Sequence, residues 1–324
     1  DFAMAGAQFV FGDLANQTEF GFIFAFQVLP TIIFFAALMG VLYHIGLMQK
    51  IVQGMAWVML KVLRISGSES LSVAANVFVG QTEAPLVVRP YIAKMTESEL
   101  FTMMVGGMAT IAGAVLAAYI AMLGGTDEAL RLFYARHLLA ASVMAAPATI
   151  VIAKLLKPET EVSLTRGTVN LEVEKTATNV IEAAANGAAD GVKLALNVGG
   201  MLLAFFALIT MVNFPLEWFG EITGIATMIG QPLNLSIILG FILSPLAWII
   251  GIPWSEAMLV GGLIGEKIII NEFVAYMHLV EIRQSLSEHS LLITTYALCG
   301  FANFASIAIQ LGGIGGLAPN RRSD

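Results

Sequence analysis

Long stretches without a charged side chain constrain this chain more than any other feature. Asp, Glu, Lys and Arg are absent from residues 20–49, 100–126, 194–216, 222–255 and 289–320. A helix needs about 20 consecutive apolar residues to cross a bilayer, and each stretch meets that length. The 324 residues are 58% hydrophobic and 12% charged, whereas a soluble domain is about 25% charged. The sequence therefore predicts an all-α, multi-pass membrane protein.

A shorter apolar stretch at 137–156 is also expected to cross, because Arg136 and Lys154 flank it and can extend to the headgroups. The net charge of −7 is distributed over loops without a basic stripe, which argues against nucleic acid as a partner. Cys299 is the only cysteine and the four histidines are scattered. Neither a disulfide nor a zinc site is expected within one chain.

The polar segment 157–178 divides the chain into two halves that repeat one series of parts. Each half has a span, an amphipathic helix, an apolar stretch interrupted by charges, and a long run with a polar, glycine-rich middle. Sequence matches follow the same order: MAW at 55–57 with LAW at 246–248, and VFVGQTE at 77–83 with LIGEKIIINE at 263–272. Secondary transporters are commonly built from inverted repeats, so we expect one here.

The stretch VFVGQTEAPLVVRP at 77–90 places a carboxylate inside an apolar region that is too short to cross. Thirteen uncharged residues separate Glu69 from Glu83, and five separate Glu83 from Arg89. Neither arm can cross a hydrocarbon core about 30 Å thick as a helix. A hairpin of two half-helices fits, and its tip should line a cavity, because irregular backbone at membrane depth needs protein or water around it.

A second interrupted stretch at 265–273 predicts another hairpin. A carboxylate near the bilayer centre costs about 2.5–3.5 kcal/mol on insertion scales, so something must compensate. Glu83 and Glu272 each lie beside a break and are the strongest functional candidates. The alternative is that each lies solvated at a helix end near the headgroups. Glu266 and Lys267 are adjacent and can neutralise one another in a structural role.

Polar residues in the uncharged runs offer oxygen ligands. Thr110 and Asn303 each lie near a glycine in mid-run, where a helix can open and leave carbonyls free for a cation. Hard oxygen ligands, including an amide and a hydroxyl, are what a sodium ion requires. The alternative is that Asn76, Thr110, Asn303 and Ser306 only satisfy hydrogen bonds within helices.

With these residues in place, the chain resembles the concentrative nucleoside transporters from about residue 20 to 319. GQTEAPLVVRP at 80–90, NEFVAY at 271–276 and CGFANFASIAIQLGG at 299–313 match that family's signature stretches. The resemblance implies a homotrimer, surrounded by membrane lipids in a bacterial inner membrane. Each protomer would import a uridine-like nucleoside with sodium by an elevator-type alternating-access movement. Sodium is co-transported, and no organic cofactor is implied.

The resemblance implies an inverted repeat with two re-entrant helical hairpins, two discontinuous transmembrane helices, a scaffold and a transport domain. The expected parts are an interfacial segment at 1–19, scaffold helices at 20–48 and 192–216, transport-domain repeats at 49–156 and 217–324, and a polar linker with a helix start at 157–191. The first repeat should hold an interfacial helix, a hairpin at 66–92, a broken helix at 97–124 and a helix at 133–156. The second should hold an interfacial helix at 234–252, a hairpin at 254–281 and a broken helix at 289–317.

The resemblance also implies roles for individual residues. The nucleobase would contact Gln81, Thr82, Glu83 and Val115; the ribose would contact Glu272, Phe301, Asn303 and Ser306; and sodium would bind the side chains of Asn76 and Thr110 with the carbonyls of Val79 and Ile111. Carboxylates accept strong, charge-assisted hydrogen bonds from ribose hydroxyls and base N–H groups, which agrees with this division.

The family normally has further spans at both ends, so the resemblance predicts a chain truncated there, with an omission near residues 284–286. A proton-coupled nucleoside symporter, with Glu83 or Glu272 carrying the proton, is the main alternative. A passive channel is less favoured, because inverted repeats serve alternating access. An enzyme is not expected, since no His or Lys lies beside a serine in the breaks and paired aspartates do not occur there.

Overall fold

The computed structural model describes residues 2–16, 23–125, 127–167 and 177–323. Parts of two predicted segments lie outside the described residues. They are residues 1 and 17–19 of the predicted segment 1–19 and residues 168–176 of the predicted linker. Regular structure in the described part is helical, apart from an isolated bridge between Ser66 and Arg166. The prediction of an all-α chain is confirmed.

Among the described residues, four helical segments are long and apolar enough to cross a membrane. They are Phe24–His44, Glu97–Gly124, Glu128–Leu156 and Val180–Thr223. A further pair, Leu235–Ile249 and Trp254–Ile269, passes the same test together but is bent by 116°. Such a bend is expected of a broken span or a re-entrant segment.

The chain forms two compact units, which are described separately. Unit 1 comprises Asp1–Leu196 with Ser306–Asp324, and unit 2 comprises Asn197–Ala305. Two helices contribute residues to both units: α12 (Val180–Thr223) and α18 (Phe304–Leu317). The predicted division into scaffold and transport domain is a separate matter and stays a prediction.

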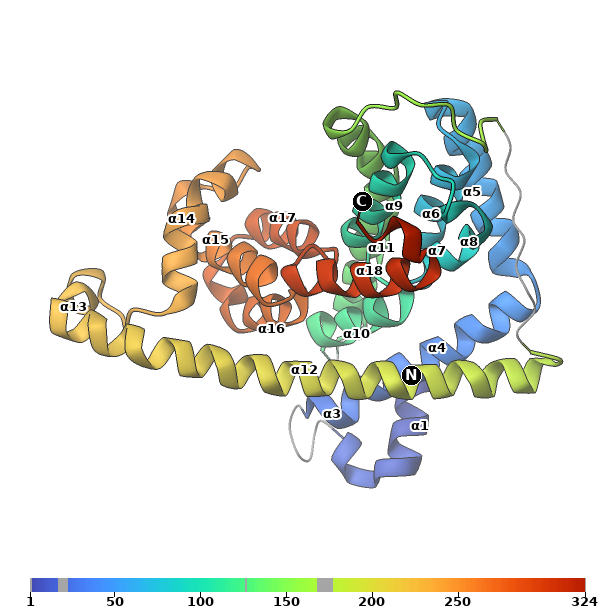
Figure 1. Ribbon diagram of the computed structural model, residues 1–324. Coiled ribbons are helices and arrows are strands. Elements are labelled where there is room, and N and C mark those ends of the chain that lie inside the picture. The colour runs from blue at the N-terminus through green and yellow to red at the C-terminus, as the bar shows by residue number, and fades with distance from the viewer. Residues whose placement is uncertain (1, 17–22, 126, 168–176, 324) are drawn as a thin grey trace. The chain divides into compact units, whose positions relative to one another are not determined.

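Unit 1 holds the helices of the N-terminal half (Figure 1). They are α1 (Phe2–Phe11), η1 (Gly12–Ala15), α3 (Phe24–Gln27), α4 (Leu29–His44), α5 (Leu47–Leu63), α6 (Gly67–Asn76), α7 (Ala84–Val87), α8 (Arg89–Ile92), α9 (Glu97–Ala109), α10 (Gly113–Gly124) and α11 (Glu128–Leu156), with residues 306–317 of α18 and η3 (Pro319–Arg321). α6 packs against α5, α9 and α11. Leu71, Val73 and Met103 belong to the buried apolar cluster there.

The first predicted hairpin region contains one helical arm, a turn and two short helices. Every residue of α6 is buried, and Ser66 and Glu69 form a capping box at its start. The chain turns over residues 77–83 and returns through α7 and α8. Pro90 lacks the N–H that would bond to the carbonyl of residue 86, so the return arm breaks at Val88 instead of forming one half-helix.

Unit 2 holds the shorter helices of the C-terminal half (Figure 1). They are α13 (Ile225–Ile229), α14 (Leu235–Ile249), α15 (Trp254–Ile269), α16 (Glu272–Ile282), η2 (Arg283–Ser285) and α17 (Glu288–Leu298), with residues 197–223 of α12. α14 and α15 approach closely through glycines, since a Cβ on Gly261 would lie 2.9 Å from the Gly240 carbonyl oxygen. The uncharged run at 222–255 is not one helix, because Gly224 and Gly230 take left-handed conformations there.

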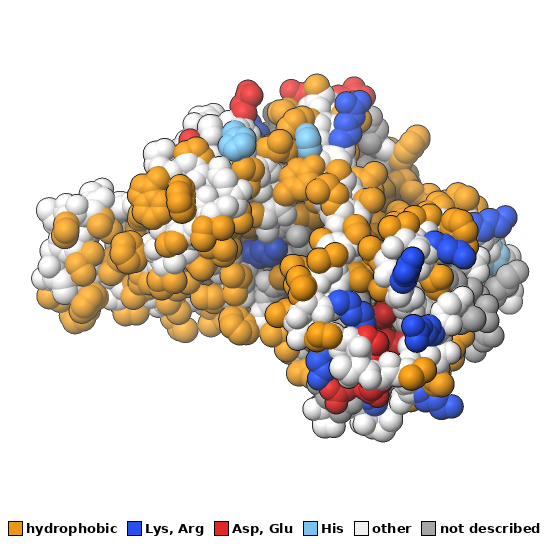
Figure 2. All heavy atoms as spheres, turned by 90° about the horizontal axis from the view of Figure 1, so that it is seen from above, with side chains coloured by type: hydrophobic (Ala, Val, Ile, Leu, Met, Phe, Trp, Pro, Cys, Tyr) orange, Lys and Arg blue, Asp and Glu red, His pale blue; other side chains and the backbone are white. Residues whose placement is uncertain are grey.

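The surface of the chain suits a lipid environment. Hydrophobic side chains cover much of the face drawn in Figure 2, and charged side chains gather in a few places. Leu203 and Phe241 are both 76% exposed. Exposing such side chains to water costs about 25 cal/mol per Å² of apolar surface. Lipid contact removes that cost.

Candidate functional site

The tip of the first hairpin presents one buried and two exposed polar residues. Gln81 is buried, whereas Thr82 and Glu83 are exposed in unit 1. Glu83 Oε2 accepts a hydrogen bond from the Gly80 N–H at 2.5 Å. A Cβ at Gly80 would lie 2.9 Å from the same oxygen. Glycine at this position therefore lets the carboxylate fold back onto the turn.

The predicted sodium ligands lie on two segments that are held together by a backbone hydrogen bond. Asn76 ends α6, and Thr110 ends α9 in an extended conformation. The Gly113 N–H donates to the Phe78 carbonyl at 2.9 Å, which joins the hairpin tip to the break between α9 and α10. This bond places the stretch containing Val79 beside the break.

Asn76 is the most unusual of these groups. It is 0% exposed, and neither atom of its amide forms a hydrogen bond with a described residue. Thr110 is also buried, and its Oγ1 donates to the Gly106 carbonyl at 3.0 Å, leaving the oxygen lone pairs as acceptors. Buried polar groups are nearly always paired, so an orphaned amide calls for a ligand such as a cation.

The break between α9 and α10 contains Ile111, and Val115 follows it; both are residues predicted for the site. Ile111 is 0% exposed and lies in the break. Val115 is 3% exposed on the first turn of α10. The described residues contain no group of three or more His, Cys, Asp or Glu side chains that could hold a metal.

Glu272 of the second hairpin meets Asn303 of the break between α17 and α18. Glu272 is the first residue of α16, next to Asn271, whose Oδ1 accepts from the Val274 N–H at 3.0 Å. Asn303 Nδ2 donates to Glu272 Oε2 at 3.1 Å, and both side chains are buried. The positive end of the helix dipole favours a carboxylate at this position. The pair presents an anionic acceptor beside an amide.

The break between α17 and α18 positions the rest of this group. Gly300 has φ +128°, a conformation that favours glycine. The turn is closed by the Asn303 N–H, which donates to the Phe301 carbonyl at 2.9 Å. Phe301 is partly buried. An aromatic ring and two polar acceptors are thus grouped within unit 2.

Ser306 belongs with the first group of residues. It lies in unit 1, where its Oγ accepts a hydrogen bond from Gln81 Nε2 at 3.1 Å. Sequence reasoning grouped Ser306 with Glu272, Phe301 and Asn303, which lie in unit 2. The structure therefore pairs Ser306 with a residue predicted for the nucleobase.

Glu266 and Lys267, which the sequence allows to neutralise one another, have other partners in the structure. Glu266 Oε2 lies 2.8 Å from His278 Nδ1, while Lys267 Nζ donates to the Ala297 carbonyl at 2.9 Å. Adjacent residues on a helix do not face each other, so the two side chains reach different neighbours. Both are buried in unit 2.

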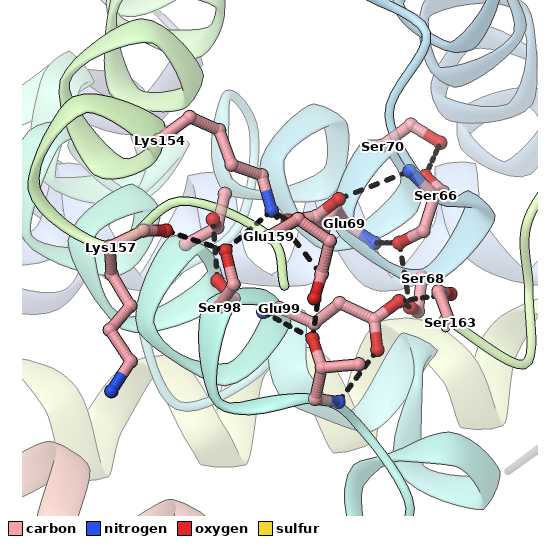
Figure 3. A network of polar contacts seen from close by, with 12 residues as sticks. Ser66, Ser68, Glu69, Ser70, Ser98, Glu99, Lys154, Lys157, Glu159 and Ser163 are labelled. Atoms are coloured by element: carbon pink, nitrogen blue, oxygen red, sulfur yellow. Dashed lines mark hydrogen bonds and ion pairs between the residues drawn. The ribbon is translucent and has the colours of Figure 1, made fainter. Parts of the chain in front are cut away.

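A polar network at the base of the first hairpin was missed by sequence reasoning (Figure 3). Lys154 forms ion pairs with Glu69 and Glu159, the latter at 3.7 Å. Its Nζ also donates to Ser98 Oγ at 2.7 Å. The signal was present in the sequence, because Ser66 to Glu69 reads as a capping box that starts a helix.

The same network includes a second capping box. Thr96 and Glu99 form it at the start of α9. Glu99 Oε1 accepts from Ser68 Oγ at 3.0 Å and from Ser163 Oγ at 2.5 Å. The segment that follows α11 is thus bound to the starts of α6 and α9 (Figure 3). These charges lie at the hairpin base, whereas the Glu83 carboxylate lies at its tip.

Comparisons with known proteins place this geometry among transporters. The family model described as "Na+ dependent nucleoside transporter C-terminus" matches residues 137–324, and a "Nucleoside recognition" model matches residues 25–126. An uncharacterized transporter of Haemophilus influenzae is 49% identical over 98% of this chain and 75% of its own. Sodium/nucleoside cotransporter 1 of Rattus norvegicus is 44% identical over 99% of this chain and 49% of its own.

Solved structures show the same similarity to transporters. CNTnw in an inward-facing, substrate-bound state has a TM-score of 0.86 at 48% identity, covering 99% of this chain and 75% of that one. A doubly substituted CNTnw in an outward-facing state has a TM-score of 0.85 at 47% identity, with the same coverage. The prediction of an inverted repeat with re-entrant hairpins is confirmed by these similarities.

Proposed function

Because the chain belongs to the Na⁺-dependent nucleoside transporter family, we propose that it is a secondary active transporter that imports nucleosides together with sodium. The observation that carries this function is the buried Glu272–Asn303 pair at the break between α17 and α18. An anionic acceptor and an amide suit the hydroxyl groups of a sugar, and discontinuous helices are where secondary transporters hold their substrates.

The nucleobase is bound at the tip of the first hairpin. Thr82 and Glu83 are exposed there and offer a hydroxyl and a carboxylate, and Gln81 offers an amide. Glu83 accepts from base N–H groups, and Val115 packs nearby against the ring. A mixture of donors and acceptors at one tip suits several base edges, so both uridine and purine nucleosides are reasonable test substrates.

The ribose is bound by Glu272 and Asn303, with Phe301 against the sugar and Ser306 completing the set. A carboxylate accepts from two hydroxyl groups at once, and such charge-assisted bonds are about twice as strong as neutral ones. The Asn303 amide that donates to Glu272 keeps the carboxylate oriented. Loss of the negative charge of Glu272 should therefore weaken sugar binding directly.

Sodium is bound by the Asn76 and Thr110 side chains and the carbonyls of Val79 and Ile111. The orphaned, fully buried Asn76 amide and the opened backbone at residues 110–112 support this assignment. Binding sodium orders the hairpin tip and the break in α9–α10, which lie side by side through the Gly113 to Phe78 hydrogen bond. The cation and the nucleobase are thereby coupled, since both contact this tip.

Transport follows alternating access. A transport domain built from the repeats at 49–156 and 217–324 moves against scaffold helices at 20–48 and 192–216 in an elevator-type motion. The protein acts as a homotrimer in a bacterial inner membrane, in contact with lipid, and it requires no organic cofactor and no nucleic acid. Light scattering of the purified protein at several detergent concentrations tests the trimer, and a monomer at all of them would contradict it.

Uptake of labelled uridine into proteoliposomes tests the function. Uptake should require an inward sodium gradient and saturate with uridine concentration. Uptake that ignores sodium but follows a proton gradient would establish the proton-coupled alternative, with Glu83 or Glu272 as the proton carrier. Conductance without saturation would indicate a passive channel. An absence of nucleoside uptake under every gradient would overturn the proposal.

A further inference from the structure

Gln310 is a buried amide to which neither the sequence nor the proposed function assigns a role. Ser306, Gln310 and Ile314 are spaced four residues apart and form the buried face of α18. Ser306 accepts from Gln81 at the tip of the first hairpin. One turn later, Gln310 is 1% exposed and donates from Nε2 to the Met104 carbonyl of α9 at 2.9 Å. α18 therefore contacts both the hairpin tip and α9.

Gly107 of α9 is the point at which these groups meet. A Cβ built on Gly107 would lie 2.5 Å from Gln310 Nε2 and 3.0 Å from Gln81 Cβ. The two glutamine side chains therefore lie against the same spot on α9. A methyl group at position 107 would displace at least one of them, so glycine allows both to approach.

The bond to Met104 determines the orientation of the Gln310 amide. A backbone carbonyl only accepts, so the nitrogen of Gln310 must face α9 and its oxygen must face away. Ser306 Oγ can donate or accept, so it does not by itself determine the orientation of Gln81. Gln81 is instead confined by its close approach to Gly107, the same residue against which the Gln310 amide lies.

Two acceptor oxygens remain at this junction. Gln81 Oε1 and Gln310 Oε1 are both buried, and neither forms a hydrogen bond with a described residue. Leaving a buried acceptor without a donor is unfavourable. Gln81 belongs to the tip residues proposed to contact the nucleobase, so a ring N–H of the base is a donor of the right chemistry for its oxygen.

We propose that Gln310 is a positioning residue for base recognition: it braces Gln81 against Gly107, so that Gln81 Oε1 accepts from a ring N–H of the nucleobase. This inference rests on the proposed function. It predicts selectivity for bases that carry such a donor, as N3–H of uracil does. Gln310 itself does not touch the substrate.

The test compares uridine with 3-methyluridine, which lacks the N3–H, in proteoliposomes under a sodium gradient. One hydrogen bond of about 1.4 kcal/mol corresponds to a tenfold preference, so wild type should favour uridine about tenfold in kcat/KM. Gln310→Met keeps the side-chain length but cannot hydrogen-bond. It should reduce the preference to about twofold by raising KM for uridine, with kcat within about twofold of wild type.

Two further variants show whether Gln81 is the group positioned. Gln81→Ala should abolish the preference, and adding Gln310→Met to it should change the preference no further. Gly107→Ala should reduce the preference as Gln310→Met does. Ile314→Ala, on the same face of α18, is the control for packing and should retain the preference. Size-exclusion profiles of all variants identify any that fail to fold.

The outcomes separate the inference from the function on which it rests. If wild type takes up no nucleoside, the proposed function and this inference both fall. If wild type prefers uridine and folded Gln310→Met keeps that preference, the inference alone is overturned. Additive losses in the double variant would also overturn it. If Gln310→Met does not fold, the preference of Gly107→Ala decides the matter.

Discussion

The two hairpins keep their charged groups in different places. In the first, Glu69 and Glu99 lie at the base, where Lys154 pairs with Glu69, and Glu83 lies exposed at the tip. In the second, the buried acids lie around the tip, at Glu266 and Glu272. Each of these two contacts a side chain of its own unit, at 2.8 Å and 3.1 Å.

This difference separates charged groups that hold a hairpin in the fold from charged groups that are proposed to bind the substrate. The base of the first hairpin is held by charges contributed by α6, α9, α11 and the segment after α11, so its tip is free to contact a ligand. In the second hairpin one buried acid serves the fold while the other faces the proposed sugar site. Two acids six residues apart on the same hairpin should therefore respond differently to neutralisation.

The largest effect is expected for Glu272→Gln. The substitution keeps the shape but removes the charge that we propose accepts from ribose hydroxyls, and losing bonds worth about 3 kcal/mol in total should lower kcat/KM at least about 100-fold. Uridine uptake into proteoliposomes measures it. The size-exclusion profile should be unchanged, and wild-type uptake by this variant would remove Glu272 from the sugar site.

The next largest effect is expected at the cation site proposed for the first hairpin. Asn76→Ala removes one proposed oxygen ligand and should raise the sodium concentration for half-maximal uptake about tenfold, equivalent to about 1.4 kcal/mol. Ser142→Ala is the matched control, because Ser142 is equally buried and its Oγ also lacks a described partner. Equal sodium dependence in both variants would place the cation elsewhere.

A third effect concerns stability rather than transport. Lys154→Met leaves Glu69 buried without its cation, which costs about 3 kcal/mol and should lower the melting temperature by about 5 °C or more. Lys157→Met is the control on the same helix end, because Lys157 pairs with Glu97 on the surface and should matter little. Comparable losses in both variants would show that the base is not held by the buried pair.

The stabilisation that the surface pair of Lys157 and Glu97 contributes depends on pH. The Glu97 carboxylate accepts from Lys157 and raises the pKa of that lysine above its usual value. Because the folded-state pKa is the higher one, any stabilisation is complete below the unfolded lysine's pKa and disappears as pH rises through the folded value. At neutral pH Lys157 is therefore fully protonated.

The smallest effect is expected for Glu266→Gln. An amide oxygen can still accept from the His278 ring, so uptake should stay within about twofold of wild type. The same uptake assay measures it, with Glu272→Gln as the contrasting variant. A loss as large as that of Glu272→Gln would show that the second hairpin does not divide its acids between fold and substrate.

The sequence by itself determined the membrane class, the all-α fold and the two hairpin regions. Local properties carry this information: run length, charge spacing, and helix starts such as Ser66 to Glu69 follow from hydropathy and backbone hydrogen bonding. The resemblance added the roles of Gln81 and Glu272, which stay predictions. The sequence predicted that Lys154 extends to the headgroups, whereas it pairs with Glu69. Neither source anticipated this pair or a role for Gln310, because the partners of both residues are remote in sequence.

The tertiary structure alone decided which partner each buried polar group takes. Glu266 and Lys267 are adjacent in the chain, yet they contact His278 and Ala297. Ser306 contacts Gln81, 225 residues away. Such contacts depend on how helices pack and which way each side chain points. The sequence of one segment specifies neither the helix packing nor the side-chain direction, because a buried polar group can pair with any correctly placed partner that satisfies it.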